Sequence, residues 1–292
     1  MIYCLGESLY DIVFSHNQPS WAVAGGGMLN AAVSLGHVGA EVQLITECGN
    51  DKIGSLIIDF LRSNFVGTDF IKVSDNNSSL ALAFLDENGN ATYQFYKDYS
   101  AEAPLFDIPV FNPGDILMFG SLYSIELRNR TNIHHLTSQA RRGGATVIYD
   151  PNFRPSNAHR VNEVMPFIKE NIASADIVRA SDEDFRIITG HDSHEDIFSF
   201  VKDNGAEILI LTLNAQGAKL FTNDEIKSFE AVATDVVSTI GAGDSFNAGI
   251  AYEIQKLNRK PIDAKDWQIV MSTGLNFAAE VCGLRENYIR KR

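Results

Sequence analysis

The sequence has few cysteines, and none of them form a recognisable pair. Its 292 residues include only Cys4, Cys48 and Cys282, which are far apart and in no CxxC motif. Three scattered cysteines do not predict a disulfide framework. They indicate buried thiols in a reducing compartment.

Basic residues are also scarce. The chain has 24 Lys and Arg against 37 Asp and Glu, which gives a net charge of −13. This acidity argues against non-specific binding to nucleic acid or to an anionic membrane. It does not exclude an anionic nucleotide, because a local nest of N–H groups and Mg²⁺ can overcome the repulsion from more distant negative charges.

Long apolar runs, linkers and repeats are lacking as well. No stretch approaches the length of a membrane span, and no basic segment followed by an apolar one opens the chain, so we expect a cytoplasmic protein. No Pro/Ser-rich linker or internal repeat divides the sequence. Its length and 45% hydrophobic content fit one large α/β domain, alone or with a small appendage.

Two common nucleotide-binding motifs are absent. No Gly-x-Gly-x-x-Gly follows the first predicted strand, which argues against a dinucleotide-dependent oxidoreductase. The Gly-x4-Gly-Lys-Ser/Thr motif of P-loop NTPases is also missing.

Apolar segments alternate with helical ones along most of the chain. This order indicates βαβ units and a mostly parallel sheet. The predicted strands are residues 2–6, 42–46, 116–120, 146–150, 177–178 and 208–213, with a strand-like segment at 231–237. Helices are predicted around residues 31–35, 53–61 and 246–257.

The periodicity changes between residues 79 and 97. Apolar residues alternate on both sides of Asn88-Gly89, which predicts an antiparallel hairpin with its turn at these two residues. Such a hairpin in an α/β chain could form a small lid or dimer surface, or an edge of the main sheet.

The most informative stretch is residues 238–244, Ser-Thr-Ile-Gly-Ala-Gly-Asp, before the predicted helix. Backbone N–H groups at a glycine turn and a helix N-terminus stabilise an anion. Asp244 is placed to take a proton from a hydroxyl group. Taken locally, the stretch fits either phosphoryl transfer or an N-capped helix after a glycine turn.

Further polar residues follow predicted strands, where ligands bind in open α/β sheets. Asp11 could bind a polyol or stabilise a turn, and the glycines at 25–27 with Asn30 could let a ligand approach the backbone. Residues 150–154 form another polar cluster. The acidic residues at 182–184 could hold Mg²⁺ through water or simply begin a helix.

Together these motifs resemble the PfkB, or ribokinase-like, carbohydrate kinases over essentially the whole chain. Gly26, Gly27 and Asn30 match the family's Gly-Gly-x-x-x-Asn signature, and residues 238–244 match Asp-Thr-x-Gly-Ala-Gly-Asp. The resemblance implies a single domain, 1–292, with a three-layer α/β/α architecture. It also implies a β lid built from segments near 12–24 and 79–98.

The resemblance also assigns roles to individual residues. It implies a kinase that uses ATP and Mg²⁺, acts on a small sugar, binds neither nucleic acid nor membranes, and dimerises through the lid. The implied catalytic residues are Asp244 as base and Gly241, Ala242 and Gly243 as anion hole. The implied sugar-binding residues are Asp11, Gly26, Gly27 and Asn30, with Lys97, Asn152 and Arg154 as further candidates. The implied nucleotide-side residues are Asp184, Thr212, Asn214, Gly217 and Asn276, and Asp184 is also the candidate ligand for Mg²⁺ through water.

Three positions depart from the family pattern. Ser238 replaces an Asp that helps to hold a monovalent cation in several members, which makes a potassium site doubtful. Ser181-x-x-Asp184 stands where the family has Asn-x-x-Glu. Asn214 replaces a glycine, although Asn tolerates the left-handed conformation.

Residues 6–11 and 150–155 are most similar to fructokinases and 2-keto-3-deoxygluconate kinases. A keto-acid substrate would need a cation for its carboxylate. Lys97 is the candidate, and we expect the adjacent Asp98 to weaken its charge, so a neutral ketohexose such as fructose is favoured. A 2-keto-3-deoxygluconate kinase, a ribokinase and a weakly active or non-catalytic sugar-binding member remain the alternatives.

Overall fold

The computed structural model describes residues 1–15, 18–85, 91–261 and 263–292. Within them, the main sheet has the strand order β13-β12-β11-β10-β9-β8-β1-β4-β5. Its strands are β1 (Ile2–Leu5), β4 (Val42–Gly49), β5 (Ile71–Ser74), β8 (Ile116–Gly120), β9 (Thr146–Asp150), β10 (Ile177–Ser181), β11 (Ile208–Thr212), β12 (Ala218–Phe221) and β13 (Ile226–Phe229). The strands from β11 to β5 pair in parallel, whereas β12 and β13 are antiparallel additions at one edge.

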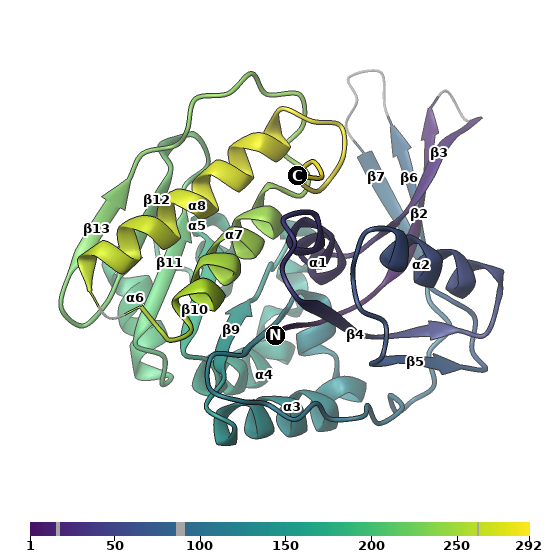
Figure 1. Cartoon of the computed structure of the whole chain (residues 1–292), viewed down its shortest axis with the longest axis horizontal. Helices are drawn as coiled ribbons and strands as arrows, with labels where there is room; N and C mark the ends of the chain where they lie inside the picture. Colours follow the sequence, from purple (N-terminus) through teal and green to yellow (C-terminus); the bar gives the residue numbers. More distant parts are fainter. Residues whose placement is uncertain (16–17, 86–90, 262) are drawn as a thin grey trace.

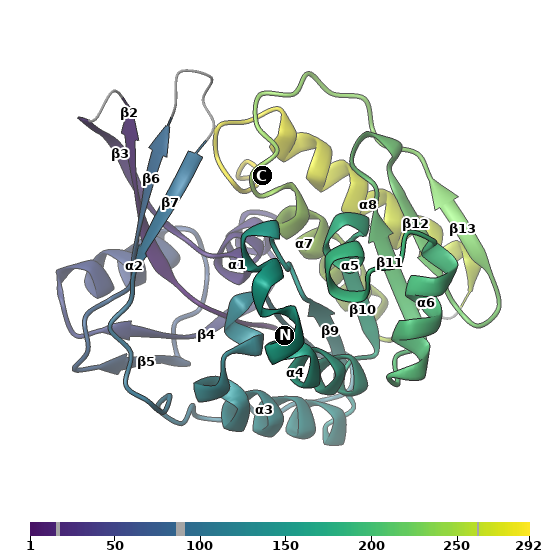
Figure 2. The ribbon, with the colours of Figure 1, turned by 180° about the vertical axis from the view of Figure 1, so that it is seen from behind.

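Helices cover both faces of this sheet (Figures 1 and 2). One face carries α1 (Gly27–His37), α2 (Lys52–Ser63), α7 (Ala242–Leu257) and α8 (Ala264–Cys282). The other carries α3 (Arg130–Arg142), α4 (Val161–Ser174), α5 (Asp182–Thr189) and α6 (His194–Asp203). Short 3₁₀ turns complete the chain: η1 (Leu122–Ile125), η2 (Leu127–Asn129), η3 (Pro155–Arg160) and η4 (Asn214–Gln216). The predicted three-layer α/β/α architecture is confirmed.

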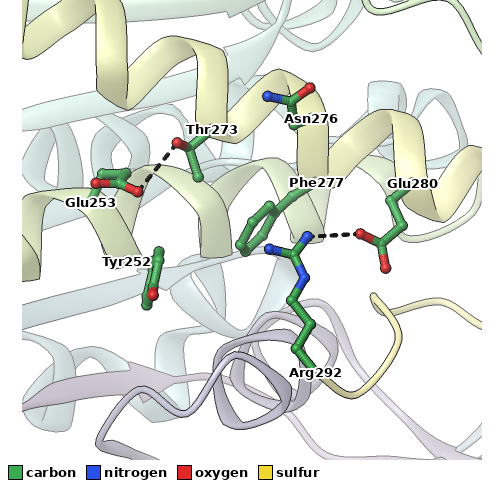
Figure 3. Close-up of a pocket in the computed structure, with 7 residues that line it drawn as sticks. All are labelled: Tyr252, Glu253, Thr273, Asn276, Phe277, Glu280 and Arg292. Carbon is green, nitrogen blue, oxygen red and sulfur yellow. Dashed lines mark hydrogen bonds and ion pairs between the residues drawn. The ribbon is translucent and has the colours of Figure 1, made fainter.

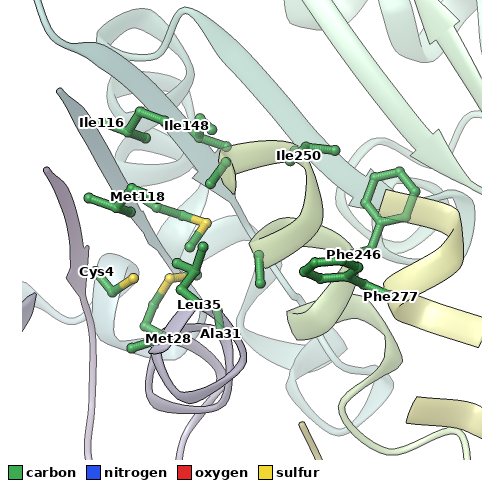
Figure 4. Close-up of a cluster of buried hydrophobic side chains, with 14 of the residues drawn as sticks. Cys4, Met28, Ala31, Leu35, Ile116, Met118, Ile148, Phe246, Ile250 and Phe277 are labelled. Carbon is green, nitrogen blue, oxygen red and sulfur yellow. The ribbon is translucent and has the colours of Figure 1, made fainter. Parts of the chain in front are cut away.

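Two hydrophobic clusters hold the layers together, because successive side chains of a strand point to opposite faces. In β8, Ile116 and Met118 belong to one cluster, and Leu117 and Phe119 belong to the other. Figure 4 shows the first cluster, where Met28 of α1 and side chains of α7 meet the sheet. This packing fixes the N-termini of α1 and α7 beside each other at the carboxyl ends of the strands.

A second, smaller sheet has the order β3-β2-β6-β7 and projects from the main body (Figure 1). Its strands are β2 (Leu9–Ser15), β3 (Gln18–Gly25), β6 (Leu80–Leu85) and β7 (Ala91–Tyr96). The strands predicted around the hairpin pair with each other and with β2, so they are not an edge of the main sheet. The predicted turn at Asn88-Gly89 lies outside the described residues.

The prediction of a strand at residues 231–237 is wrong. This segment has no regular secondary structure, and its valines are exposed, with Val236 at 64%. It crosses the surface, where the N–H groups of Val237 and Ser238 both donate to the carbonyl of Cys282. The sheet instead ends at β12 and β13, two strands that the sequence analysis did not predict.

No helix among the described residues combines the length and the apolar character that crossing a membrane requires.

Candidate active site

The predicted base, Asp244, lies in the first turn of α7. The preceding Gly241 has a φ of 81°, and a side chain there would collide with the backbone of Asn287, so only glycine fits this turn. Asp244 is 7% exposed, and its Oδ2 accepts a hydrogen bond from Asn30 Nδ2 at 2.9 Å. Burial raises the pKa of Asp244 to about 6, against the lowering effect of the Asn30 hydrogen bond.

The second oxygen of Asp244, Oδ1, faces the start of α1. A Cβ added at Gly27 would lie 3.1 Å from Asp244 Oδ1, 3.0 Å from Ser121 Oγ and 3.4 Å from Asn152 Nδ2. Three polar groups from different elements therefore converge on the bare backbone of Gly27. Asn30 occupies Oδ2, so Oδ1 is the oxygen free to take a proton.

A cavity of about 160 Å³ adjoins this point. It is lined by Gly6, Glu7, Leu9, Gly26, Gly27, Met28, Phe95, Lys97, Ser121, Leu122, Asn152 and Arg154. The structure thus gathers five of the seven predicted sugar-binding residues around one cavity. Asn30 adjoins it through Asp244, and its buried Oδ1 has no partner among the described residues, which leaves an acceptor for a ligand hydroxyl.

The remaining predicted sugar-binding residue, Asp11, lies on β2 in the small sheet. Burial raises the pKa of its carboxyl to about 6. The strand register places Ala81 opposite both Asp11 and Phe95, so Asp11 and the cavity-lining Phe95 are on the same face of the small sheet. Asp11 therefore faces the cavity side of the molecule.

Two cations line the cavity, and they differ in their pairing. Lys97 forms an ion pair with Glu7 at 2.6 Å, and Glu7 also accepts a hydrogen bond from the hydroxyl of Tyr99. The expectation that Asp98 weakens the charge of Lys97 is wrong, because Asp98 accepts hydrogen bonds from Asn77 instead. Arg154 is exposed and forms no ion pair with any described residue; its charge favours the ionised form of Asp244.

Arg179 is a buried arginine next to the glycine turn, and the sequence analysis missed it. Arg179 of β10 donates from Nη1 to Asp150 Oδ2 at 2.9 Å and from Nη2 to Thr212 Oγ1 at 2.8 Å. A Cβ at Gly243 would lie 3.0 Å from its guanidinium. Arg179 therefore joins the ends of β9 and β11 to the first turn of α7. A lone arginine within the apolar run Ile-Val-Arg-Ala could have signalled it.

Asp184, the candidate ligand for Mg²⁺, lies in the first turn of α5 and forms a capping box with Ser181. Burial, and then repulsion from Asp150, raise the pKa of Asp184 to about 6. The described residues contain no group of three or more acidic, His or Cys side chains that could enclose a metal. One carboxylate fits Mg²⁺ held mainly by water and by phosphates of a ligand, which is its usual environment in phosphoryl-transfer sites.

Comparison with known proteins agrees with this geometry. The model of the pfkB family of carbohydrate kinases matches residues 2–286. The chain belongs to the PfkB family of carbohydrate kinases. It is 30% identical over 266 residues to a fructokinase of Rhizobium leguminosarum bv. trifolii, an alignment that covers 88% of this chain and 81% of the relative.

Solved structures share the fold of this carbohydrate kinase. Fructokinase from Vibrio cholerae O395, crystallised with fructose, ADP and a calcium ion, superposes with a TM-score of 0.87 at 22% identity and covers 98% and 94% of the two chains. Aminoimidazole riboside kinase from Salmonella enterica, in complex with its riboside and an ATP analogue, gives 0.84 at 23% identity and covers 97% and 94%. At these identities the likeness shows the ribokinase-like fold.

Two positions at which this PfkB-family chain departs from the common motif have local structural explanations. Asn214 adopts a left-handed φ of 52°, so the turn before Gly217 keeps its shape without the glycine, as expected. The hydroxyl of Ser238 accepts a hydrogen bond from Ile240 N at 3.2 Å and stabilises the turn before Gly241.

Asn276 does not line the cavity beside Gly27. It is on α8 and lines a separate cavity of about 400 Å³ with Tyr252, Glu253, Thr273, Phe277, Glu280 and Arg292 (Figure 3). This cavity shares no lining residue with the one beside Gly27.

Proposed function

We propose that this PfkB-family kinase transfers the γ-phosphoryl group of ATP to a hydroxyl of fructose. The observation that carries the proposal is the buried Asp244 at the N-terminus of α7, whose Oδ1 would lie 3.1 Å from a Cβ added at the cavity-lining Gly27. A carboxylate base beside a cluster of backbone donors suits transfer to a neutral hydroxyl.

In the proposed reaction, Asp244 Oδ1 accepts the proton of the sugar hydroxyl while the hydroxyl oxygen forms a bond to the γ-phosphorus. The bond from that phosphorus to the β–γ bridging oxygen breaks, and ADP leaves. The N–H groups of residues 241–243, at the positive end of the α7 dipole, stabilise the charge on the transferred group. Asp184 would hold Mg²⁺ through water, and the bound ion would neutralise phosphate charge.

The nucleotide-side assignments are part of the same proposal. Thr212, Asn214 and Gly217 form the end of β11 and the turn after it, at the same sheet edge as Asp184. Arg179 supports this side by holding Thr212 in place. Asn276, which lines the cavity on α8, is proposed to lie beside the adenine.

The charge of the cavity favours a neutral sugar over an acidic one. Lys97 is already paired with Glu7, whose side chain is 15% exposed, so an acidic substrate would have to displace a carboxylate from it. Asp11 and Asp244 add negative charge around the same space. A cavity of about 160 Å³ is small, which suits a monosaccharide.

Two alternatives have specific support. Arg154, unpaired at the cavity, could bind the carboxylate of 2-keto-3-deoxygluconate. A riboside is the other alternative substrate, because one structural neighbour was crystallised with aminoimidazole riboside. A non-catalytic sugar-binding member would bind a sugar without turnover.

A panel of sugars with ATP and Mg²⁺ tests the proposal. We expect fructose to give the highest kcat/KM, and Asp244→Asn to bind the sugar without turning it over. Higher kcat/KM for 2-keto-3-deoxygluconate or a riboside would replace fructose as the substrate. No product from any sugar, while a sugar still raises the Tm, would favour the non-catalytic alternative.

We also propose that the small sheet pairs with a second copy of this chain. The face opposite Phe95 carries Phe14 and Phe84, whose rings stack at 5.0 Å, and Phe84 is 38% exposed. Exposed aromatic residues gathered on a projecting sheet are typical of an interface. A dimer in sedimentation that Phe84→Lys converts to monomers is the expected result, and a monomeric wild-type protein would refute this part.

A further inference from the structure

Ser121, immediately after β8, has a backbone conformation that is rarely accessible to a residue with a side chain. Its φ of 54° and ψ of −166° lie in a region occupied almost entirely by glycine. Such strain persists only where the surroundings impose it, and it concentrates at functional sites. The conformation therefore calls for a functional explanation.

Hydrogen bonds on both sides of Ser121 hold it there. Its N–H donates to the carbonyl of Asp150 at 2.9 Å. Its own carbonyl accepts from the backbone N–H of Ser124 at 3.0 Å and from the Ser124 hydroxyl at 2.7 Å. A glycine would satisfy the same backbone hydrogen bonds without strain, so the backbone alone does not explain the serine.

The side chain of Ser121 points into the cavity. Its Oγ would lie 3.0 Å from a Cβ at Gly27, beside Asp244 Oδ1, and it accepts a hydrogen bond from Asn152 Nδ2 at 3.3 Å. A hydroxyl has one proton to donate and two acceptor positions. Since Asn152 uses an acceptor position and no described residue accepts the Ser121 proton, that proton is available to a ligand.

Asn152 reinforces this arrangement. It also has a positive φ, 41°, and its backbone N–H is fixed by Asp150 Oδ1 at 2.9 Å. The amide that orients the Ser121 hydroxyl is thus itself held from β9. Ser121 follows β8 and Asn152 follows β9; both have unusual backbone conformations, and both side chains lie beside Gly27, as does Asp244 Oδ1.

We propose that Ser121 is a substrate-positioning residue whose hydroxyl donates a hydrogen bond to a sugar oxygen next to the hydroxyl that faces Asp244. This inference rests on the proposed kinase function and deepens it. The Ser121 hydrogen bond fixes the rotation of the sugar, so the reacting hydroxyl stays against Asp244 Oδ1 and in line with the phosphoryl group. Positioning of this kind accelerates transfer because the reacting groups are already oriented when the sugar is bound.

Two substitutions distinguish the effect of the Ser121 hydroxyl from the effect of its backbone strain. Ser121→Ala removes the hydroxyl and keeps the strain, whereas Ser121→Gly removes both. We expect both to lower kcat/KM by about tenfold, the effect of one lost hydrogen bond to substrate. We expect Ser121→Gly to have the higher Tm of the two. Asn258→Gly, at a positive φ of 53° at the far end of α7, is the matched control and should leave kcat/KM unchanged.

A set of singly deoxygenated analogues of the preferred sugar identifies the contact. Among analogues that still react, one should be a poorer substrate for the wild type and show no further loss in Ser121→Ala, because the two changes remove the same hydrogen bond. The mutants should also release more free phosphate per sugar phosphate formed, which a purely structural role would not cause.

Each outcome bears on the proposal separately from the kinase function. If the wild type phosphorylates the sugar and Ser121→Gly keeps its full kcat/KM, the positioning role is refuted and the kinase function stands. An equal loss with every analogue would refute it as well, since the hydroxyl would then touch no particular sugar oxygen. A wild type without sugar-dependent turnover would instead refute the kinase function.

Discussion

Gly27→Ala should strongly lower kcat/KM while leaving the fold intact. Gly27 is the first residue of α1, and its backbone has no positive φ, so alanine can adopt its conformation. The added methyl would lie 3.0 Å from Ser121 Oγ and 3.1 Å from Asp244 Oδ1. These distances are tight but need shifts of only a few tenths of an ångström. The methyl would nevertheless cover the two oxygens that the sugar is proposed to reach.

The size of the effect follows from the two contacts. Losing two hydrogen bonds to the sugar, each contributing about 1.5 kcal/mol, removes about 3 kcal/mol of transition-state stabilisation. That corresponds to roughly a hundredfold decrease in kcat/KM. Alanine is more favourable than glycine in a helix by up to about 1 kcal/mol, which offsets the crowding, so the Tm should change by only a few degrees.

Sugar-dependent ADP release and thermal unfolding, measured on the same preparations, test this reasoning. Gly26→Ala is the matched control, because Gly26 has a φ of 132° and a side chain there would collide with the carbonyl of Glu7. We expect Gly26→Ala to lower the Tm clearly and Gly27→Ala to lower only kcat/KM. A Gly27→Ala protein with kcat/KM near that of the wild type would show that the sugar does not approach this backbone.

Four further predictions concern charge. Because the base must be ionised, kcat/KM should fall as the pH drops through about 6, which is the raised pKa of Asp244. Asp244→Asn should lower kcat by about 10³-fold. The pKa of Asp244 in the folded state lies above its ordinary value of 3.8, so this carboxyl contributes its full stabilisation below pH 3.8 and loses it as the pH rises through about 6. Asp244→Asn should therefore have a higher Tm than the wild type at pH 8. An unchanged or lower Tm would contradict the argument that burial raises this pKa. Glu7→Gln frees Lys97 and should raise kcat/KM for an acidic sugar relative to fructose by about tenfold; an unchanged ratio would mean that the ion pair does not set substrate charge. Potassium should leave the rate unchanged because Ser238 supplies no carboxylate, and strong activation in a titration with potassium chloride would refute this.

The predictable part of the site is the part carried by contiguous motifs. The glycine turn before Asp244 and the Gly-Gly-x-x-x-Asn stretch could be recognised because each motif places its own backbone. Periodicity likewise predicted the parallel strands other than β5, and the strands of the hairpin. The strand prediction for residues 231–237 failed because a segment rich in valine does not show whether a partner strand is available.

Contacts between distant segments could not be predicted from one sequence. Glu7 pairs with Lys97 across 90 positions, and Arg179 reaches Asp150 and Thr212 from β10. Each is an ordinary residue in its local context, and only folding brings it to the site. Asp98 was expected to weaken the charge of Lys97 because it is adjacent in sequence, yet it contacts Asn77 instead.

The three departures from the family motif differ in what they change physically. Asn214 preserves the backbone, because it adopts the left-handed conformation that a glycine would supply. Asp184 keeps a carboxylate, and this side chain also forms a capping box with Ser181 at the start of α5. Ser238 alone removes a charge, and its hydroxyl is used locally, at 3.2 Å from Ile240 N. A carboxylate is therefore kept at position 184 and absent at position 238, which makes cation dependence, rather than catalysis itself, the property in which this chain should differ from relatives that carry aspartate at position 238.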